Sequence, residues 1–587
     1  MTAVKNVKKK KKKTLGDNAP KGHSGQASTL PTDVDSTTTR DARILRWSSA
    51  VKNPVVRRRT VVRRIKLLRQ CCASRQARRH LRSIARLISS KPKDAQAVET
   101  LLASVFDQAS RADDCWVLRE GVVWGLAWLA QPKRAAKTTG TLLERCVTQG
   151  EEACLALRQR KTAAAAFVLV LGRLFYADKR VTHFESTAVA ALEEEIGRLV
   201  SSEGAVGLTG SVHTIERICR WAHCRSLGET QEDIPWNEAT EESFDAALGF
   251  GLRLLGKRGQ LLLLHGQQTA APLLKAAQNC SRRKVRRTAK AMASNKRKHL
   301  IGRGILSRDC EDAAAAMAVM RSNWTSDSLR VLIDYRDVMP RIEIVAENQL
   351  LLDGLWEWNV TCDGESLSAE GPWELNCLES ETVATYFEIR APLAGGFQIE
   401  RSITLSCVDH VLVFADTITK RDRKNSEELL CYSSSIPVVQ HINVEPALES
   451  REIFLSDTSV RGVAMPLALP EWRAGGGKGD FVSKDGTLSL SQQGMGRLFA
   501  PLWLDVESRR LGEQLTWRQI TVADARINVP PSMASGHRVQ VGIDQWLLYR
   551  ALDAPRNRTL LGFNTSGEYV LGRITPDGTV QRTIEIP

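Results

Sequence analysis

Residues 282–298 read RRKVRRTAKAMASNKRK and residues 318–335 read AVMRSNWTSDSLRVLIDY, and the character of the chain changes between these two stretches. Upstream, apolar residues recur at spacings of three and four, the period of an α-helix. Downstream, Val, Ile, Thr and aromatic residues form short runs separated by Gly, Asp, Asn and Pro, which is typical of antiparallel strands. Helices followed by strands predict an α+β multidomain protein with two packed domains of different class.

The chain upstream of this boundary is predicted to be helical. Residues 41–95 repeat apolar side chains at helical spacing while their other faces carry arginines, so we expect a basic helical arm. Residues 96–300 continue the helical period, with Gly, Pro or short polar turns between segments, and residues 282–298 form a basic hinge. The helices expected are Ala97–Ala109, Trp116–Leu129, Thr141–Arg158, Thr162–Tyr176, Ser186–Val200, Val212–Ser226, Glu241–Leu255 and Ala270–Ala277.

The chain downstream is predicted to form an antiparallel β domain over residues 318–587, reached through a linker at 301–317. The clearest strands expected are Arg330–Tyr335, Val383–Ile389, Phe397–Leu405, Val411–Ala415 and Gln545–Tyr549. At the other end of the chain, residues 1–40 contain six consecutive lysines and few apolar groups. We expect this tail to be disordered, because it has little surface to bury.

The net charge of +17 comes from one end of the chain. Residues 1–100 hold 26 Lys+Arg against 6 Asp+Glu, a net of +20, whereas the other 487 residues hold 57 against 60, a net of −3. Six lysines in a row followed by an arginine-rich helix are expected to bind polyanions by counterion release. We therefore expect residues 5–90 to make nonspecific contact with a polyanion.

Membrane insertion and secretion are not indicated by the sequence. The longest apolar run is Ala163–Leu171, about nine residues against the roughly 20 that a bilayer requires. The N-terminal lysines lead into polar sequence without an apolar signal core, and 13 cysteines in irregular spacing suit a reducing compartment. These features predict a cytoplasmic protein.

The order of the two domains and several local sequences resemble the heparinase II/III family of polysaccharide lyases. Ala318–Trp324, followed by Leu329–Asp334, is similar to that family's entry into its β domain. Ile399–Ile403 followed by Val411–Asp416 is similar to a strand pair of the family, and residues 204–213 look like one of its inter-helix loops. The resemblance covers residues 60–587 and implies an incomplete α/α toroid at residues 96–300 followed by an antiparallel β-sandwich. Because members of that family commonly act in the cell envelope, the resemblance also implies the cell envelope as an alternative to the cytoplasm.

The catalytic residues that the resemblance implies are only partly present. Active members of that family carry a His-x-His-x-Asp-like segment after the junction strand, whereas residues 336–344 read RDVMPRIEI. β-Elimination at a uronate needs a group that neutralises the carboxylate, a base for the C5 proton and an acid for the leaving oxygen. The candidates are His213 and Tyr335 as proton carriers and Arg341 or Arg321 on the carboxylate, and each is also explained by an ordinary structural role. We therefore expect an eroded lyase site.

Tryptophans supply candidates for sugar binding. Trp356 and Trp358 are two positions apart and so share one face of a strand, where indole rings either stack on sugar rings or fill a core between sheets. Trp324, close to Arg321 in sequence, completes the expected substrate-binding set of Arg321, Trp324, Trp356 and Trp358.

A metal site is not expected. Cys219 and His223 lie four residues apart and so share a helix face, but two more ligands are not evident. We expect neither a metal nor another cofactor.

The sequence thus predicts a heparinase II/III-like protein that binds acidic, uronate-containing polysaccharide and, by resemblance, cleaves it by β-elimination at an eroded site. The alternative is an inactive scaffold whose basic N-terminal arm binds nucleic acid or another anionic surface. Nothing in the sequence indicates an oligomeric state.

Overall fold

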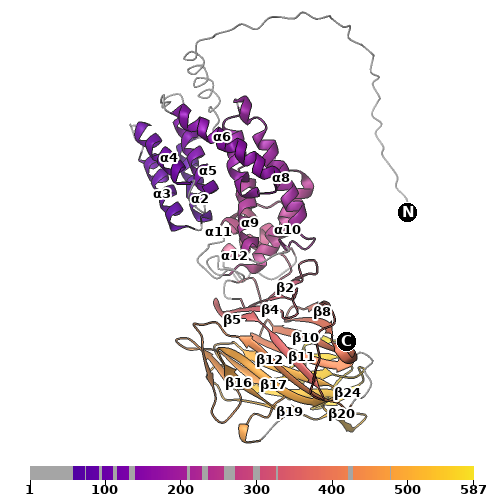
Figure 1. Cartoon of the computed structure of the whole chain (residues 1–587). Coiled ribbons are helices and arrows are strands. Elements are labelled where there is room, and N and C mark those ends of the chain that lie inside the picture. Colours follow the sequence, from indigo (N-terminus) through magenta and orange to yellow (C-terminus); the bar gives the residue numbers. More distant parts are fainter. Residues whose placement is uncertain are drawn as a thin grey trace, which may run out of the picture.

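In the computed structural model, a body of helices lies against a body of strands (Figure 1). The structure describes residues 57–72, 74–90, 95–109, 115–130, 139–176, 178–207, 212–227, 236–256, 271–294, 304–325, 328–420, 427–475 and 478–587. The predicted tail at 1–40 and the first part of the predicted arm lie outside the described residues. Among the described residues, no helix is long and apolar enough to cross a membrane.

The helices begin and end close to the residues that the sequence predicts. They are α2 (Arg58–Cys71), α3 (Arg75–Ser89), α4 (Ala95–Ala109), α5 (Cys115–Leu129), α6 (Thr139–Arg158), α7 (Ala165–Leu174), α8 (Phe184–Leu199), α9 (Val212–Arg225), α10 (Glu238–Leu254), α11 (Ala271–Gln278) and α12 (Arg283–Ser294). Side-chain caps fix two of the helix starts: Ser74 accepts from the backbone N–H of Gln76, and Asn237 from that of Thr240. Most of the basic hinge predicted at 282–298 is a helix, α12, because Val285, Ala289 and Ala291 bury one side of it.

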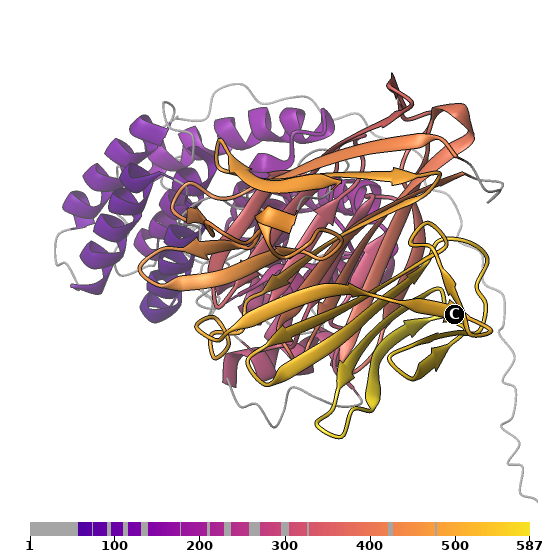
Figure 2. The same ribbon diagram turned by 90° about the horizontal axis from the view of Figure 1, so that it is seen from below.

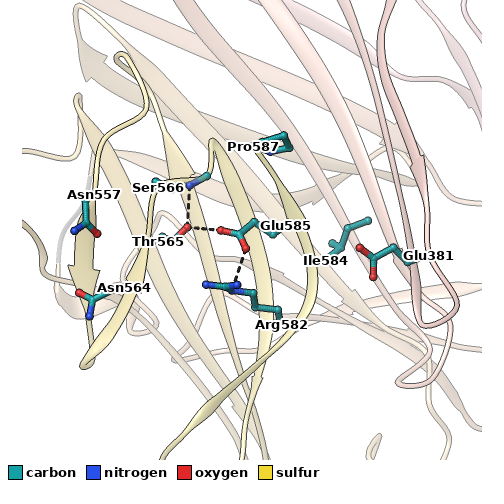
Figure 3. Close-up of a pocket in the computed structure, with 10 residues that line it drawn as sticks. Glu381, Asn557, Asn564, Thr565, Ser566, Arg582, Ile584, Glu585 and Pro587 are labelled. Carbon is teal, nitrogen blue, oxygen red and sulfur yellow. Dashed lines mark hydrogen bonds and ion pairs between the residues drawn. The ribbon is translucent and has the colours of Figure 1, made fainter.

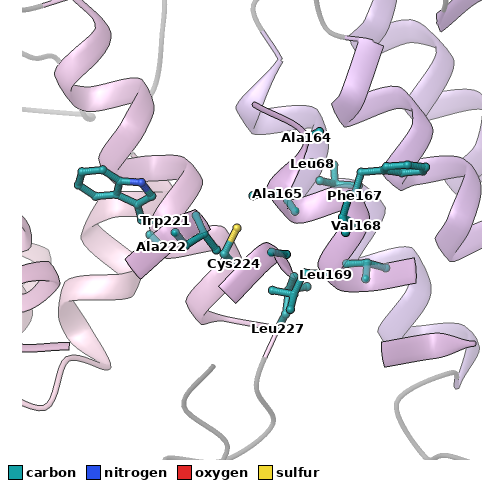
Figure 4. Packing of buried hydrophobic residues seen from close by; sticks show 14 of the residues in the cluster. Leu68, Ala164, Ala165, Phe167, Val168, Leu169, Trp221, Ala222, Cys224 and Leu227 are labelled. Carbon is teal, nitrogen blue, oxygen red and sulfur yellow. The ribbon is translucent and has the colours of Figure 1, made fainter. Parts of the chain in front are cut away.

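One hydrophobic core runs through the helical body and includes the basic helices at its start. Leu68 of α2 lies in the same cluster as Phe167 and Leu169 of α7 and Trp221 of α9 (Figure 4). On α3, the buried positions Ala77, Leu81, Ile84, Ala85 and Ile88 repeat at helical spacing. The described part of the predicted basic helical arm is therefore a hairpin whose apolar faces pack into the core of the helical body.

The β body consists of antiparallel sheets whose strands largely follow chain order. One sheet holds β1 (Cys310–Asp312), β2 (Met317–Arg321), β3 (Arg330–Asp334), β4 (Arg341–Ala346) and β5 (Gln349–Leu355). Strand β1 lies within the range 301–317 predicted as a linker. The widest sheet has the order β13 (Asn443–Pro446), β14 (Ile453–Ser456), β15 (Val460–Pro466), β18 (Leu498–Asp505), β11 (Val411–Lys420), β10 (Phe397–Ser406), β9 (Ala384–Pro392) and β8 (Glu374–Ser380).

Among the described residues, three further sheets belong to the β body, whose strands Figure 2 shows from below. The first has the order β16 (Gly479–Lys484), β17 (Thr487–Met495), β12 (Leu429–Pro437), β6 (Glu357–Cys362) and β7 (Glu365–Ser366). The second has the order β19 (Leu515–Ile520), β22 (Ala534–Val541), β23 (Asp544–Ala551), β26 (Tyr569–Ile574) and β27 (Val580–Ile586). The third has the order β21 (Ile527–Val529), β20 (Val522–Asp524), β24 (Arg558–Leu560) and β25 (Phe563–Thr565).

The wide sheet is buried on both faces because its strands alternate between two cores. On β11, Leu412 and Phe414 enter one core, whereas Val411, Val413 and Ala415 enter the other, which they share with residues of the β19–β27 sheet. The predicted fold class, an incomplete α/α toroid followed by an antiparallel β-sandwich, is confirmed. The sandwich has more layers than the sequence indicated, since sheets cover the wide sheet on both sides.

Candidate functional site

Arg321 of β2 joins the β body to the end of helix α10. Its side chain is fully buried, and Nη1 donates to the carbonyl oxygens of Leu252 at 3.0 Å, Arg253 at 2.9 Å and Leu255 at 2.8 Å. The last carbonyls of a helix lack partners within the helix and carry the negative end of its dipole, so a guanidinium is well matched to them. Its Nη2 donates to Ser328 Oγ at 2.9 Å. Burial of the guanidinium lowers the pKa of Arg321. The prediction that Arg321 binds substrate is therefore corrected to a structural role at the domain junction.

Trp324 belongs to the same junction. Its ring is buried under the Arg321 guanidinium, 4.8 Å from the ring centroid, and its Nε1 donates to the Leu306 carbonyl at 3.3 Å. Nearby, Arg330 of β3 donates to the Leu254 carbonyl at 3.1 Å, so two arginines hold the end of α10. The indole has no exposed face for a sugar, which corrects the prediction for Trp324.

A second contact ties β1 to the loop that precedes helix α9. The buried carboxylate of Asp312 accepts hydrogen bonds from the Ser201 hydroxyl and, at 3.2 Å, from the Ala205 backbone N–H. Gly204 makes this loop possible, because it has φ +92° and a Cβ there would lie 2.3 Å from the Ala246 carbonyl oxygen. His213 follows in the first turn of α9, and its side chain lies outside the described residues, so its proposed role stays a prediction.

Tyr335 lies at the end of β3 in an acidic environment. Its hydroxyl donates to the carboxylate of Glu311 on β1, and burial together with that bond raises the pKa of Tyr335. Burial also raises the pKa of Glu311, and the neighbouring charges of Asp312 and Glu203 raise it further. A uronate carboxylate placed beside Tyr335 would therefore meet several negative charges, which disfavours proton abstraction from a uronate at this tyrosine.

Arg341 of β4 is half exposed but already paired. Its Nη2 donates to Asp353 of β5, and its Nε lies 3.9 Å from Glu343 Oε1. Tyr335 instead donates to Glu311 of β1, a different carboxylate from the Asp353 that Arg341 contacts. Both side chains are thus engaged by carboxylates of the β body, and their catalytic roles stay predictions.

Trp356 and Trp358 both point into the β core, which corrects the prediction of a sugar-stacking surface. Trp356 lies under the buried Arg401 guanidinium, 3.9 Å from its ring centroid. Trp358 packs edge-to-face against Trp373 with centroids 6.5 Å apart, and both indole N–H groups donate to the Val338 carbonyl. The shared face predicted from their spacing is correct, but that face is the inside of the sheet.

The helical body contains a buried polar cluster that the sequence reasoning missed. Glu120 of α5 lies 2.7 Å from Nε2 of His223 on α9, and Trp124 Nε1 donates to the same carboxylate at 3.2 Å. The available signal was one glutamate in the middle of an apolar helix. Among the described residues, no group of three or more His, Cys, Asp or Glu side chains could hold a metal ion, and Cys224 beside His223 is a buried thiol whose pKa is raised by burial.

The hairpin of α2 and α3 presents an uncompensated cationic surface. Its exposed side chains repeat at spacings of four and three, so each helix carries one stripe of cations. We call the cationic hairpin face the set Arg59, Arg63, Lys66, Arg75, Arg79, Arg82 and Arg86. The sequence has no Asp or Glu between Asp41 and Asp94, and none of these seven side chains makes an ion pair within the described part of the chain.

The cationic hairpin face continues onto helix α11. Burial and the charges of Arg63 and Arg64 lower the pKa of Lys275, which shows that positive groups of the two helices lie close together. Arg64 itself is engaged, because its Nη1 donates to Ser226 Oγ at 2.8 Å. Lys275 and the cationic hairpin face therefore bring positive charges together with no acidic partner among the described residues, an arrangement suited to a polyanion.

Comparison with solved structures places the architecture among the heparinases. No known family profile matches the chain, and no curated protein matches it in sequence. A mutant of the heparan sulfate lyase HepC from Pedobacter heparinus superposes with a TM-score of 0.53 at 9% identity over 90% of this chain and 91% of that one. Heparinase III superposes with a TM-score of 0.51 at 10% identity over 81% of this chain and 82% of that one.

The likeness is one of fold. Both comparisons span the helical and the β body, so the order of domains and their arrangement are shared. The heparinase-like fold predicted from the junction sequence is confirmed. At 9–10% identity the match does not carry the activity of those lyases over to this chain.

Proposed function

We propose that this protein binds acidic, uronate-containing polysaccharide without an assembled lyase site. The observation that carries the proposal is the cationic hairpin face, which lies on the helical body of a heparinase-like fold and has no acidic partner within the described residues. Guanidinium groups present planar, paired donors that match carboxylate and sulfate oxygens. Polysaccharide is also the substrate class suggested by the structurally similar lyases.

The spacing of the cations favours an extended ligand. Arg59, Arg63 and Lys66 span two helical turns on α2, and the α3 stripe from Arg75 to Arg86 spans three. At 1.5 Å per residue, the α3 stripe extends about 16 Å. A chain with repeated negative groups engages several of these side chains at once, which gives affinity that a single small anion does not reach.

The environment of the predicted catalytic residues argues against cleavage. Tyr335 donates to Glu311, and Arg341 is paired with Asp353. β-Elimination requires carboxylate neutralisation beside a proton acceptor. Here the tyrosine faces carboxylates and the arginine is engaged elsewhere, so we propose a binding protein with an eroded catalytic site.

The test is equilibrium binding of heparin and alginate oligosaccharides at several salt concentrations. The hairpin variant replaces Arg59, Arg63, Arg79 and Arg82 with Gln. The matched control variant removes four exposed cations from α12, namely Arg283, Lys284, Arg287 and Lys290. We expect the hairpin variant to weaken binding at least about tenfold and to lower the salt slope by up to about four, while the control keeps the wild-type slope. An equal loss in both variants would show that overall charge, not the hairpin, binds the ligand.

Nucleic acid is the second candidate, because the same arginines also fit phosphate. Within residues 57–90, His80 is the one ring that could stack on a base, and it is half buried, so base-specific reading has little support. A competition experiment with duplex DNA separates the candidates. Nucleic acid would be favoured as the partner if DNA displaces bound heparin oligosaccharides at a lower concentration of negative charge than uronate oligosaccharides require.

As part of the same proposal, we place the protein in the cytoplasm, and the argument is the state of its cysteines. Every cysteine whose side chain the structure describes is a free thiol, which suits a reducing compartment and supports the cytoplasm over the cell envelope. Thiol titration of the protein purified without reductant tests this assignment, which predicts free thiols throughout.

A further inference from the structure

A pocket of about 600 Å³ lies in the β body, where turns and strands from three sheets meet. Figure 3 shows Glu381, from the turn between β8 and β9, on one side of the pocket and Asn557 and Asn564, at β24 and β25, on the other. Arg582 and Glu585 of β27 lie between them. The volume is within the usual range for a small-ligand site, roughly 300–1,000 Å³.

The centre of the pocket is a fixed polar wall. Thr565 Oγ1 donates to Glu585 Oε1 at 2.7 Å and accepts from the Gly567 backbone N–H at 2.9 Å. Arg582 Nε lies 2.9 Å from Glu585 Oε2 on the other side. Gly567 allows this packing, since a Cβ there would come within 3.0 Å of Glu585 Oε1. The Glu585 carboxylate is therefore held in one orientation at the pocket surface.

The outer walls carry polar groups that are free or only partly engaged within the described structure. The Glu381 carboxylate and the Asn557 carboxamide make no hydrogen bond or ion pair with another described residue. Asn564 Oδ1 accepts from Thr559 Oγ1 at 2.5 Å, which leaves the two N–H donors of that amide for a ligand. The pocket thus offers carboxylate acceptors on one side and amide donors on the other.

We propose that this pocket binds an uncharged saccharide unit. Each sugar hydroxyl donates one hydrogen bond and accepts others, so neighbouring hydroxyls match a carboxylate facing amide N–H groups. The two carboxylates outnumber the one guanidinium, which is already paired with Glu585, so uronate, sulfate and phosphate groups are disfavoured. Ile584 is buried beneath the pocket floor, so the exposed lining is polar and the recognition rests on the carboxylates and amides. This site is independent of the cationic hairpin face and takes the opposite class of glycan.

The experiment is calorimetric titration of the full chain with malto-, cello-, xylo- and manno-hexasaccharides. The pocket variant combines Glu381→Gln with Asn557→Ala, both exposed positions. The control combines Glu379→Gln with Asn528→Ala, exposed residues that do not line the pocket. We expect at least one hexasaccharide to bind, the pocket variant to weaken it about tenfold or more, and the control to bind like the wild type.

Three results would overturn the proposal. One is that no hexasaccharide binds at millimolar concentration, and another is that the pocket variant binds as tightly as the wild type. The third is tighter binding of a glucosamine hexasaccharide than of every neutral one, since a cationic ligand would then be the better match. Binding of heparin oligosaccharides to the pocket variant must equal the wild type in each case, because that interaction belongs to the hairpin.

Discussion

Replacing Arg321 with Met should weaken the junction between the helical and β bodies and lower the free energy of unfolding. The substitution keeps a long apolar side chain but removes the guanidinium that donates to Leu252, Arg253 and Leu255. Each buried acceptor left without a donor costs about 1–3 kcal/mol, and regained solvation of the lost charge offsets part of the sum. The net loss expected is about 3–5 kcal/mol, the usual result of removing one partner from a buried charged network.

Scanning calorimetry measures this effect, because a domain of this size loses roughly 2–4 °C of midpoint temperature per kcal/mol. Arg321→Met should lower the first unfolding transition by about 10 °C, and Arg321→Lys by less, because it keeps the charge but not the planar fork. Arg518→Met is the matched control, since Arg518 is exposed on β19 and should shift the midpoint by less than about 2 °C. A shift that small for Arg321→Met would refute the assigned role.

Three further predictions follow from particular contacts. His537 is fully buried, and burial lowers its pKa to about 4. Because the unfolded chain binds this proton more readily, the free energy of unfolding should be constant above about pH 6.5 and fall by about 2 kcal/mol between pH 8 and pH 5. Chemical denaturation should show this loss in the wild type and not in His537→Gln. Gly204→Ala should destabilise the fold by about 1–3 kcal/mol, whereas Gly197→Ala in open space on α8 should be neutral or stabilising, and equal midpoints would contradict the role of the loop. Glu120→Gln should cost about 1–3 kcal/mol by weakening its bond to His223, and an unchanged melting temperature would show that the pair is not structurally important.

The helical half was largely predictable because its signal is local. Apolar spacing placed α5 and α9 within one residue of their observed bounds. The exception is α12, whose density of Arg and Lys hid the buried positions Val285 and Ala289. Charge on the exposed faces of a helix does not prevent burial of its other side, so composition misled where periodicity was informative.

The candidate site was less predictable, because it depends on contacts distant in sequence. Alternation placed Trp356 and Trp358 on one face but did not say that other sheets cover that face. Arg321 was predicted to bind substrate because its true partners could not be identified from the sequence. These are carbonyl oxygens at the end of a helix, 66–69 residues earlier in the chain. The missing His-x-His-x-Asp-like segment could be noted from the sequence alone, since it concerns which residues are present rather than where they lie, and the eroded site that it indicates stays a prediction.

The most direct measurement is the ultraviolet absorbance of an unsaturated uronate product, followed while the protein is saturated with heparin or alginate oligosaccharides. If the protein binds the ligand at an eroded site, the absorbance should stay flat at ligand concentrations where calorimetry shows full occupancy of the wild type. At the same concentrations the hairpin variant should show little binding. A rising trace that Tyr335→Phe or His213→Ala abolishes would contradict this conclusion and establish a working lyase.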